Sequence, residues 1–94
     1  MLGGENMTNE QFITTAKKQV LEHINQHLPE GQEPKTIDDV FVVWSCKTLQ
    51  NYKAMLSAKG KGVMYYELTY NGDRKELYLD AYKKFENRCI KVVD

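Results

Sequence analysis

The sequence predicts an α+β fold with the element order α-β-β-β-β-α, in which an antiparallel sheet carries two helices packed on one face. Apolar residues recur at helical spacing near both ends of the chain, and a run of β-branched and aromatic residues begins at Val40. The 94 residues are 41% hydrophobic and 28% charged, which is typical of a globular protein of one domain. We therefore expect a single α+β domain over residues 8–94.

Residues 1–7 are expected to form a disordered leader outside this domain. Leu2-Gly3-Gly4-Glu5-Asn6 stands directly before a second methionine, Met7. Codons for Leu-Gly-Gly-Glu can form a purine-rich stretch of the kind that recruits bacterial ribosomes. Two explanations remain open: a translated ribosome-binding site upstream of a natural start at Met7, or an ordinary flexible terminus that begins at Met1.

The first helix is the clearest predicted element. Thr8 is a favourable N-cap, and Gln11 three residues later completes a capping-box pattern. Apolar residues then follow at helical spacing as far as Leu28, and Pro29 ends the helix. His23 and His27 are four residues apart and share one helix face. This spacing suits a metal, but no third ligand is near in the sequence, so we expect two histidines that face solvent.

Four strands are predicted in the middle of the chain, over residues 40–48, 52–57, 63–70 and 75–79. A helix over residues 47–58 is the alternative for the second strand, because Leu49, Tyr52 and Leu56 fit helical spacing. A flexible basic loop that contains Lys59 and Lys61 separates the second strand from the third. Gly72-Asp73 is the predicted turn of the last hairpin, because an Asn71-Gly72 turn would place Glu67 opposite Glu76.

The second helix is predicted over residues 80–91. Leu79, Tyr82, Phe85 and Cys89 recur at helical spacing, and Asp80 is a plausible N-cap.

Alternation along the strands assigns each side chain to one face of the sheet. The helix-covered core is expected to contain Trp44 and Cys46 with apolar side chains of all four strands: Val40, Val42, Ala54, Leu56, Tyr66, Leu68, Leu77 and Leu79. The other face mixes aromatic, sulfur-containing and charged side chains. The candidate binding residues on that face are Lys47, Lys53, Met55, Tyr65 and Tyr78, and Lys59 and Lys61 form a candidate basic loop.

Charge and motifs restrict the functional classes. Thirteen basic residues balance thirteen acidic ones, so no global charge favours nucleic acid, although residues 1–40 carry −4 and residues 41–94 carry +4. No apolar run approaches the length of a membrane-spanning helix, and the first residues do not form a signal peptide. No catalytic motif is present, and Cys46 is expected to be an inert core thiol. We predict no enzyme activity, no metal site and no cofactor.

Three segments resemble a family of small uncharacterised proteins encoded by phages and prophages of Gram-positive bacteria. They are residues 40–51 (VFVVWSCKTLQN), 64–73 (MYYELTYNGD) and 77–87 (LYLDAYKKFEN), and the similarity extends over roughly residues 8–91. The resemblance implies a phage accessory protein in the bacterial host cytosol and transfers no catalytic residue. We expect a cytoplasmic protein that binds a host or phage protein, or forms a homodimer. The alternative is a small nucleic-acid-binding module that uses the open sheet face, with Tyr65 and Tyr78 stacking on bases.

Overall fold

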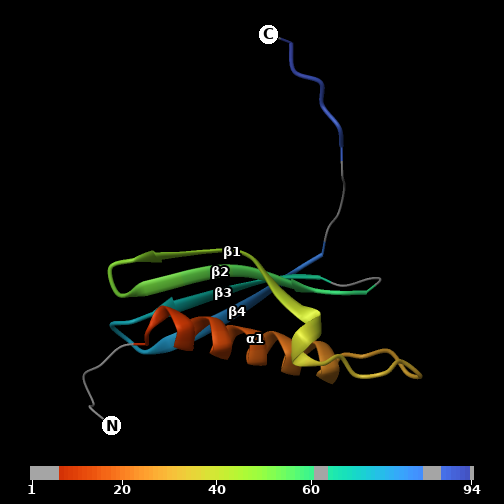
Figure 1. Cartoon of the computed structure of the whole chain (residues 1–94), viewed down its shortest axis with the longest axis horizontal. Helices are drawn as coiled ribbons and strands as arrows, with labels where there is room; N and C mark the ends of the chain where they lie inside the picture. Colours follow the sequence, from red (N-terminus) through yellow and green to blue (C-terminus); the bar gives the residue numbers. More distant parts are fainter. Residues whose placement is uncertain (1–6, 61–63, 84–87, 94) are drawn as a thin grey trace.

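The computed structural model describes residues 7–60, 64–83 and 88–93. In this part of the chain it has two layers, an α-helix and a four-stranded antiparallel sheet of order β1-β2-β3-β4 (Figure 1). The elements are α1 (Asn9–Gln26), the 3-10 helix η1 (Ile37–Asp39), β1 (Val40–Thr48), β2 (Asn51–Ala58), β3 (Tyr65–Asn71) and β4 (Glu76–Tyr82). The predicted α+β class and the four strands are confirmed.

Helix α1 begins at the predicted capping box. Thr8 Oγ1 accepts a hydrogen bond from the Gln11 backbone N–H at 3.1 Å, and Gln11 Oε1 accepts one from the Thr8 N–H at 2.9 Å. Two of the N–H groups that a helix start leaves unpaired are thereby satisfied. The predicted N-terminal boundary of α1 is therefore confirmed.

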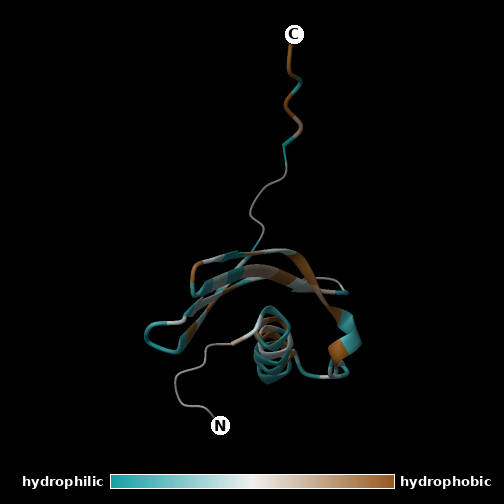
Figure 2. Cartoon of the chain, turned by 60° about the vertical axis from the view of Figure 1, so that its left-hand side comes forward, coloured by the Kyte–Doolittle hydropathy of each residue, from teal (hydrophilic) through white to brown (hydrophobic). Residues whose placement is uncertain are grey.

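The core lies between α1 and the face of the sheet that curves over it (Figure 2). The helix contributes one apolar stripe at i, i+4 spacing: Phe12, Ala16, Val20 and Ile24. The sheet contributes alternate residues of β2 and β3: Tyr52, Ala54, Leu56, Ala58, Tyr66, Leu68 and Tyr70. Phe12 stacks on Tyr52 with ring centroids 5.1 Å apart, which joins the first turn of α1 to β2. β2 confirms the predicted strand over residues 52–57 and contradicts the helical alternative over residues 47–58.

The second predicted helix is not confirmed. Asp80 to Tyr82 belong to β4, and residues 88–93 are exposed and have no regular secondary structure. Residues 84–87 lie outside the described residues. Backbone pairing with β3 holds residues 80–82 in the sheet. Leu77, Leu79 and Ala81 lie on the side of β4 that faces α1, so the alternation of side chains between the two faces continues to the end of the strand. The sheet is thus covered by α1 alone within the described part of the chain.

A β-bulge in β1 overturns the prediction that Trp44 and Cys46 are buried in the core. Val42 pairs with Leu56, but Trp44 pairs with Met55, so Val43 is an extra residue in β1. One inserted residue reverses the alternation of all the residues that follow it. Trp44 is accordingly 42% exposed, and Cys46 is an exposed free thiol.

The last hairpin turns through four residues instead of the predicted two. Asn71 pairs with Glu76 and Leu68 with Leu79, so the register differs by two residues from the one that a Gly72-Asp73 turn would give. Asn71 Oδ1 accepts hydrogen bonds from the backbone N–H groups of Asp73 and Arg74, and thereby stabilises the longer turn. A shift of two residues keeps every side chain on its predicted face, so the assignment of β3 and β4 to faces survives this error.

Two further expectations concern a leader at residues 1–7 and membrane-spanning helices. Residues 1–6, the bulk of the predicted leader, lie outside the described residues. Among those that are described, no helix combines the length and the apolar character needed to cross a membrane.

Candidate functional site

The face of the sheet opposite α1, which we call the open face, is the most distinctive surface of the described chain. Strand pairing places its members in rows across the four strands, for example Trp44 beside Met55, Met55 beside Glu67, and Glu67 beside Asp80. The open face includes Phe41, Trp44, Cys46, Lys53, Met55, Tyr65, Glu67, Thr69, Glu76, Tyr78, Asp80 and Tyr82.

Large apolar and aromatic side chains on the open face are exposed to solvent. Phe41 and Trp44 on β1 are 43% and 42% exposed, and Tyr78 and Tyr82 on β4 are 52% and 48% exposed. Met55 lies between the two strands and is half-buried. Aromatic rings and Met are enriched in protein interfaces. Tyr and Trp in particular bury much area with few rotatable bonds. The two sides of the open face therefore carry the residue types typical of a binding surface.

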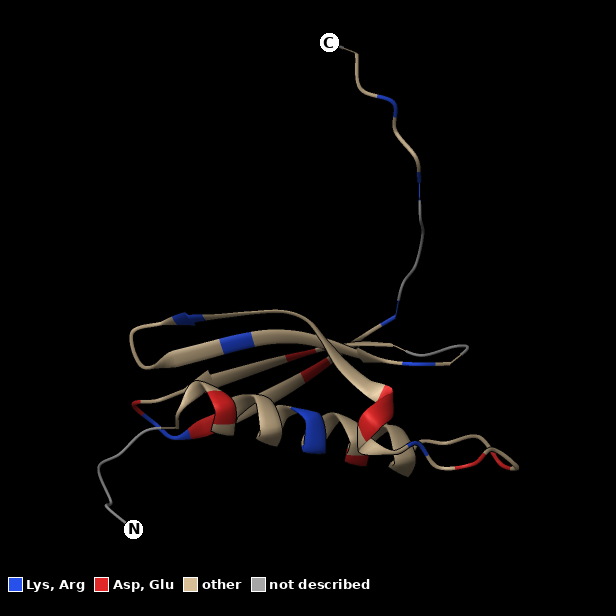
Figure 3. Ribbon diagram, in the orientation of Figure 1, with Lys and Arg blue, Asp and Glu red and all other residues tan. Residues whose placement is uncertain are grey.

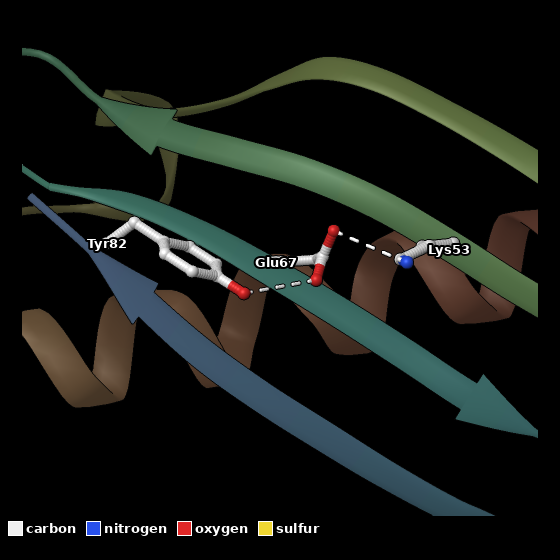
Figure 4. A network of polar contacts seen from close by, with 3 residues as sticks. All are labelled: Lys53, Glu67 and Tyr82. Carbon is white, nitrogen blue, oxygen red and sulfur yellow. Dashed lines mark hydrogen bonds and ion pairs between the residues drawn. The ribbon is translucent and has the colours of Figure 1, made fainter. Parts of the chain in front are cut away.

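A polar network crosses the middle of this face (Figure 4). Lys53 Nζ lies 3.5 Å from Glu67 Oε2, and the Tyr82 hydroxyl donates a hydrogen bond to Glu67 Oε1 at 3.4 Å. The Glu67 carboxylate, with the smaller effect of burial, raises the pKa of the Tyr82 phenol above its ordinary value. Tyr82 therefore remains a neutral hydrogen-bond donor at physiological pH.

The side of the open face formed by β3 and β4 is acidic (Figure 3). Glu67 stands directly opposite Asp80, and Glu76 at the start of β4 accepts a hydrogen bond from the Tyr78 hydroxyl at 2.8 Å. That hydrogen bond raises the pKa of Tyr78, and the charge of Glu76 raises it further. With Lys53 as the counter-charge, these four ionisable groups sum to −2, which favours a cationic partner group over a phosphate.

Four of the predicted binding residues lie together on the open face: Lys53, Met55, Tyr65 and Tyr78. Lys47 does not, because the bulge at Val43 turns it to the helix side, where its Nζ lies 5.3 Å from the centre of the Tyr52 ring. Lys59 is exposed, and its backbone N–H donates to the Asp39 carbonyl at 2.9 Å. Lys61, the other half of the candidate basic loop, lies outside the described residues.

Phe41, Trp44 and Tyr82 are members of the open face that the sequence interpretation missed. Alternation from the buried Val40 places Phe41 outward, so a usable signal existed for that residue. No such signal existed for Trp44, because its position depends on the bulge. Tyr82 was assigned to the helix that the described residues do not form.

The two histidines of α1 stack on each other, with ring centroids 4.3 Å apart. His27 Nδ1 bonds to the His23 carbonyl oxygen at 2.8 Å, and His23 is half-buried, so the expectation that both histidines face solvent holds for His27 alone. Within the described ranges, no group of three or more His, Cys, Asp or Glu side chains is placed to hold a metal ion.

A protein-family model matches residues 13–92, which include most of α1 and all four strands. The chain belongs to DUF6275, a family of unknown function. The match extends past β4, so the exposed residues 88–92 also belong to the sequence pattern of the DUF6275 family. No curated protein and no solved structure matches the chain.

Proposed function

We propose that this DUF6275 protein is a non-enzymatic accessory protein of a phage or prophage, and that it binds a host or phage protein through the open face in the bacterial cytosol. The observation that carries the proposal is the group of exposed aromatic rings on β1 and β4, the pairs Phe41 with Trp44 and Tyr78 with Tyr82. Exposed apolar groups of this size on one face mark interaction sites more often than scattered single residues do. The phage context rests on the resemblance of residues 40–51, 64–73 and 77–87.

The charges of the open face define the chemistry of the partner. Glu67, Asp80 and Glu76 lie on the β3–β4 side, and Lys53 is already paired with Glu67. A complementary surface carries apolar side chains opposite Trp44 and Met55 and one or more Lys or Arg side chains opposite Asp80. Such a surface desolvates the aromatic rings and pairs the acidic groups.

The same charges count against the nucleic-acid alternative. The two lysines among the predicted binding residues are not free to meet phosphates, because Lys47 lies over the Tyr52 ring on the helix side and Lys53 pairs with Glu67. The acidic groups beside Tyr78 repel a phosphate backbone. Tyr65 and Tyr78 remain in place for stacking on bases, so binding of nucleic acid is retained as an outcome of the test.

Photo-crosslinking from the open face tests the proposal. A photoreactive phenylalanine derivative replaces Tyr78 in one variant and Lys18, on the exposed side of α1, in a matched control. We expect the Tyr78 variant, and not the control, to form a crosslink to one discrete protein in bacterial host lysate, and we expect nuclease treatment to leave this crosslink unchanged. The crosslinked protein, once purified, is expected to bind the Asp80→Lys variant about fivefold more weakly than the unmodified protein. Equal crosslinking from both positions, or a nuclease-sensitive crosslink at position 78, contradicts protein binding through this face.

A further inference from the structure

A cavity of about 480 Å³ lies on the opposite side of the molecule from the open face. It is open to solvent on one side and is lined by the C-terminal half of α1, by the loop that follows this helix, and by residues of β3 and β4 and the segment before β3. Leu28, Met64, Tyr66 and Ala81 form much of its wall, and the volume is within the range of small-molecule sites in proteins. The proposed binding of a protein on the open face does not use this cavity.

The polar groups around the cavity are cationic or neutral. His23, His27, Lys35 and Gln32 line it, and none of the described lining residues is acidic. The chain as a whole has as many acidic as basic residues, so a lining that contains Lys35 and no described carboxylate is a local departure from the average. Such a wall favours an anion.

The loop that carries Lys35 is fixed to the helix. The Asn25 side chain accepts a hydrogen bond from the Lys35 backbone N–H at 2.9 Å and donates one to the Lys35 carbonyl at 3.1 Å. This pair of bonds closes the loop over the end of α1 and holds the Lys35 backbone at the rim of the cavity. A preformed rim reduces the ordering cost of binding.

One histidine of the cavity lining, His23, has a ring nitrogen without a hydrogen-bond partner among the described residues. His23 packs its ring edge-on against Tyr66 at 5.5 Å and stacks on His27. Its Nδ1 is buried and has no hydrogen-bond partner in the described structure. A buried polar atom without a partner is uncommon in proteins.

We propose that this cavity binds a small amphiphilic carboxylate, an apolar ring or short chain that carries one carboxyl group. The apolar part contacts Leu28, Met64 and Tyr66. The carboxylate accepts hydrogen bonds from Lys35 and from the His23 imidazole. Charge-assisted hydrogen bonds of this kind are the strong ones in sites that are mostly apolar.

Titration with 2-naphthoate, followed by amide NMR spectra, tests the proposal. We expect shifts centred on Ile24, Leu28, Met64 and Tyr66, and binding of the uncharged analogue 2-naphthylmethanol at least tenfold weaker. Lys35→Glu is expected to weaken naphthoate binding at least fivefold, whereas Lys18→Glu, the same charge change on the exposed side of α1, leaves it within twofold.

Ala81→Phe provides a second variant, because the added ring fills the cavity from β4. It is expected to abolish the naphthoate shifts while the remaining amide spectrum stays dispersed. Equal affinity for the acid and the alcohol, an equal effect of the two lysine variants, or shifts centred on the open-face residues Phe41 and Trp44 would overturn the proposal. Retained binding in a folded Ala81→Phe protein would also overturn it.

Discussion

Trp44 on β1 pairs with Met55 on β2, on the side of the sheet that faces away from α1. This pairing follows from the extra residue Val43, and it places the single tryptophan of the chain on the open face. Without the bulge the Trp44 ring would point toward α1, and the open face would lose one of its largest apolar groups. The bulge therefore shapes both the core and the candidate binding surface.

The first prediction compares this tryptophan with a core leucine. Leu68 is fully buried, so Leu68→Ala is expected to lower the free energy of unfolding by about 2–5 kcal/mol. Trp44→Ala, at a position 42% exposed, is expected to cost less than half of the Leu68 effect. Urea unfolding of both variants measures the difference. A Trp44→Ala cost equal to or above that of Leu68→Ala contradicts the bulged register.

The second prediction concerns the capping box. Thr8→Ala removes the oxygen that accepts the Gln11 N–H and is expected to destabilise the protein by about 1 kcal/mol. Thr14→Ala, at an exposed position inside α1, is the matched control and is expected to be neutral or stabilising because Ala has the higher helix propensity. Thermal unfolding measures both. Equal effects would mean that the cap does not define the start of α1.

The third prediction concerns the contact between the two hairpin turns. Gly72 is buried, and a Cβ added to it would overlap the Gln50 carbonyl oxygen, which belongs to the backbone of the tight turn between β1 and β2. Gly72→Ala is therefore expected to destabilise the protein by about 1–3 kcal/mol through overpacking.

Gly31→Ala is the control for that steric effect. Gly31 has a φ of +87°, but no atom lies within 4 Å of its added Cβ, so only backbone strain opposes the substitution. We expect an effect of about 1 kcal/mol there. Urea unfolding distinguishes the two, and a neutral Gly72→Ala would contradict the close approach of the turns.

The fourth prediction is a pH dependence of stability that originates at His23. Burial lowers the pKa of this histidine below its ordinary value, and the imidazole of His27 lowers it further. The unfolded chain then binds a proton more readily than the folded one, so stability is full above the unfolded pKa near 6.5 and falls as the pH drops below it. The melting temperature should decrease between pH 7.5 and 5.5, and His23→Gln should flatten this slope. An unchanged slope would assign the effect to another group.

Local signals were sufficient for some elements of the fold. The capping box at Thr8 and Gln11 defined α1, because both of its hydrogen bonds form within three residues of each other. Alternation in β2 and β3 identified the buried Leu56 and Leu68, since these strands lie inside the sheet and are regular. The same regularity placed Lys53, Met55 and Tyr65 correctly on the open face.

The errors arose where distant contacts decide the structure. Val42, Val43 and Trp44 all favour a regular strand, and nothing in them marks which residue is the bulge. Like charges were expected to avoid each other across the last hairpin, yet Glu67 stands opposite Asp80. Lys53 from β2 and Tyr82 from β4 neutralise and hydrogen-bond the Glu67 carboxylate, which the hairpin sequence alone could not reveal.

The most direct test of the open face as a binding surface is the alkylation rate of Cys46. This thiol is exposed on β1 beside Lys53, and Cys89 in the exposed segment 88–93 is an internal reference in the same molecule. We expect iodoacetamide to modify both thiols in the free protein. Saturation with the purified partner identified by crosslinking at position 78 should slow modification of Cys46 at least tenfold relative to Cys89. A Cys46 that is inert in the free protein, or equally reactive in the complex, would contradict the account.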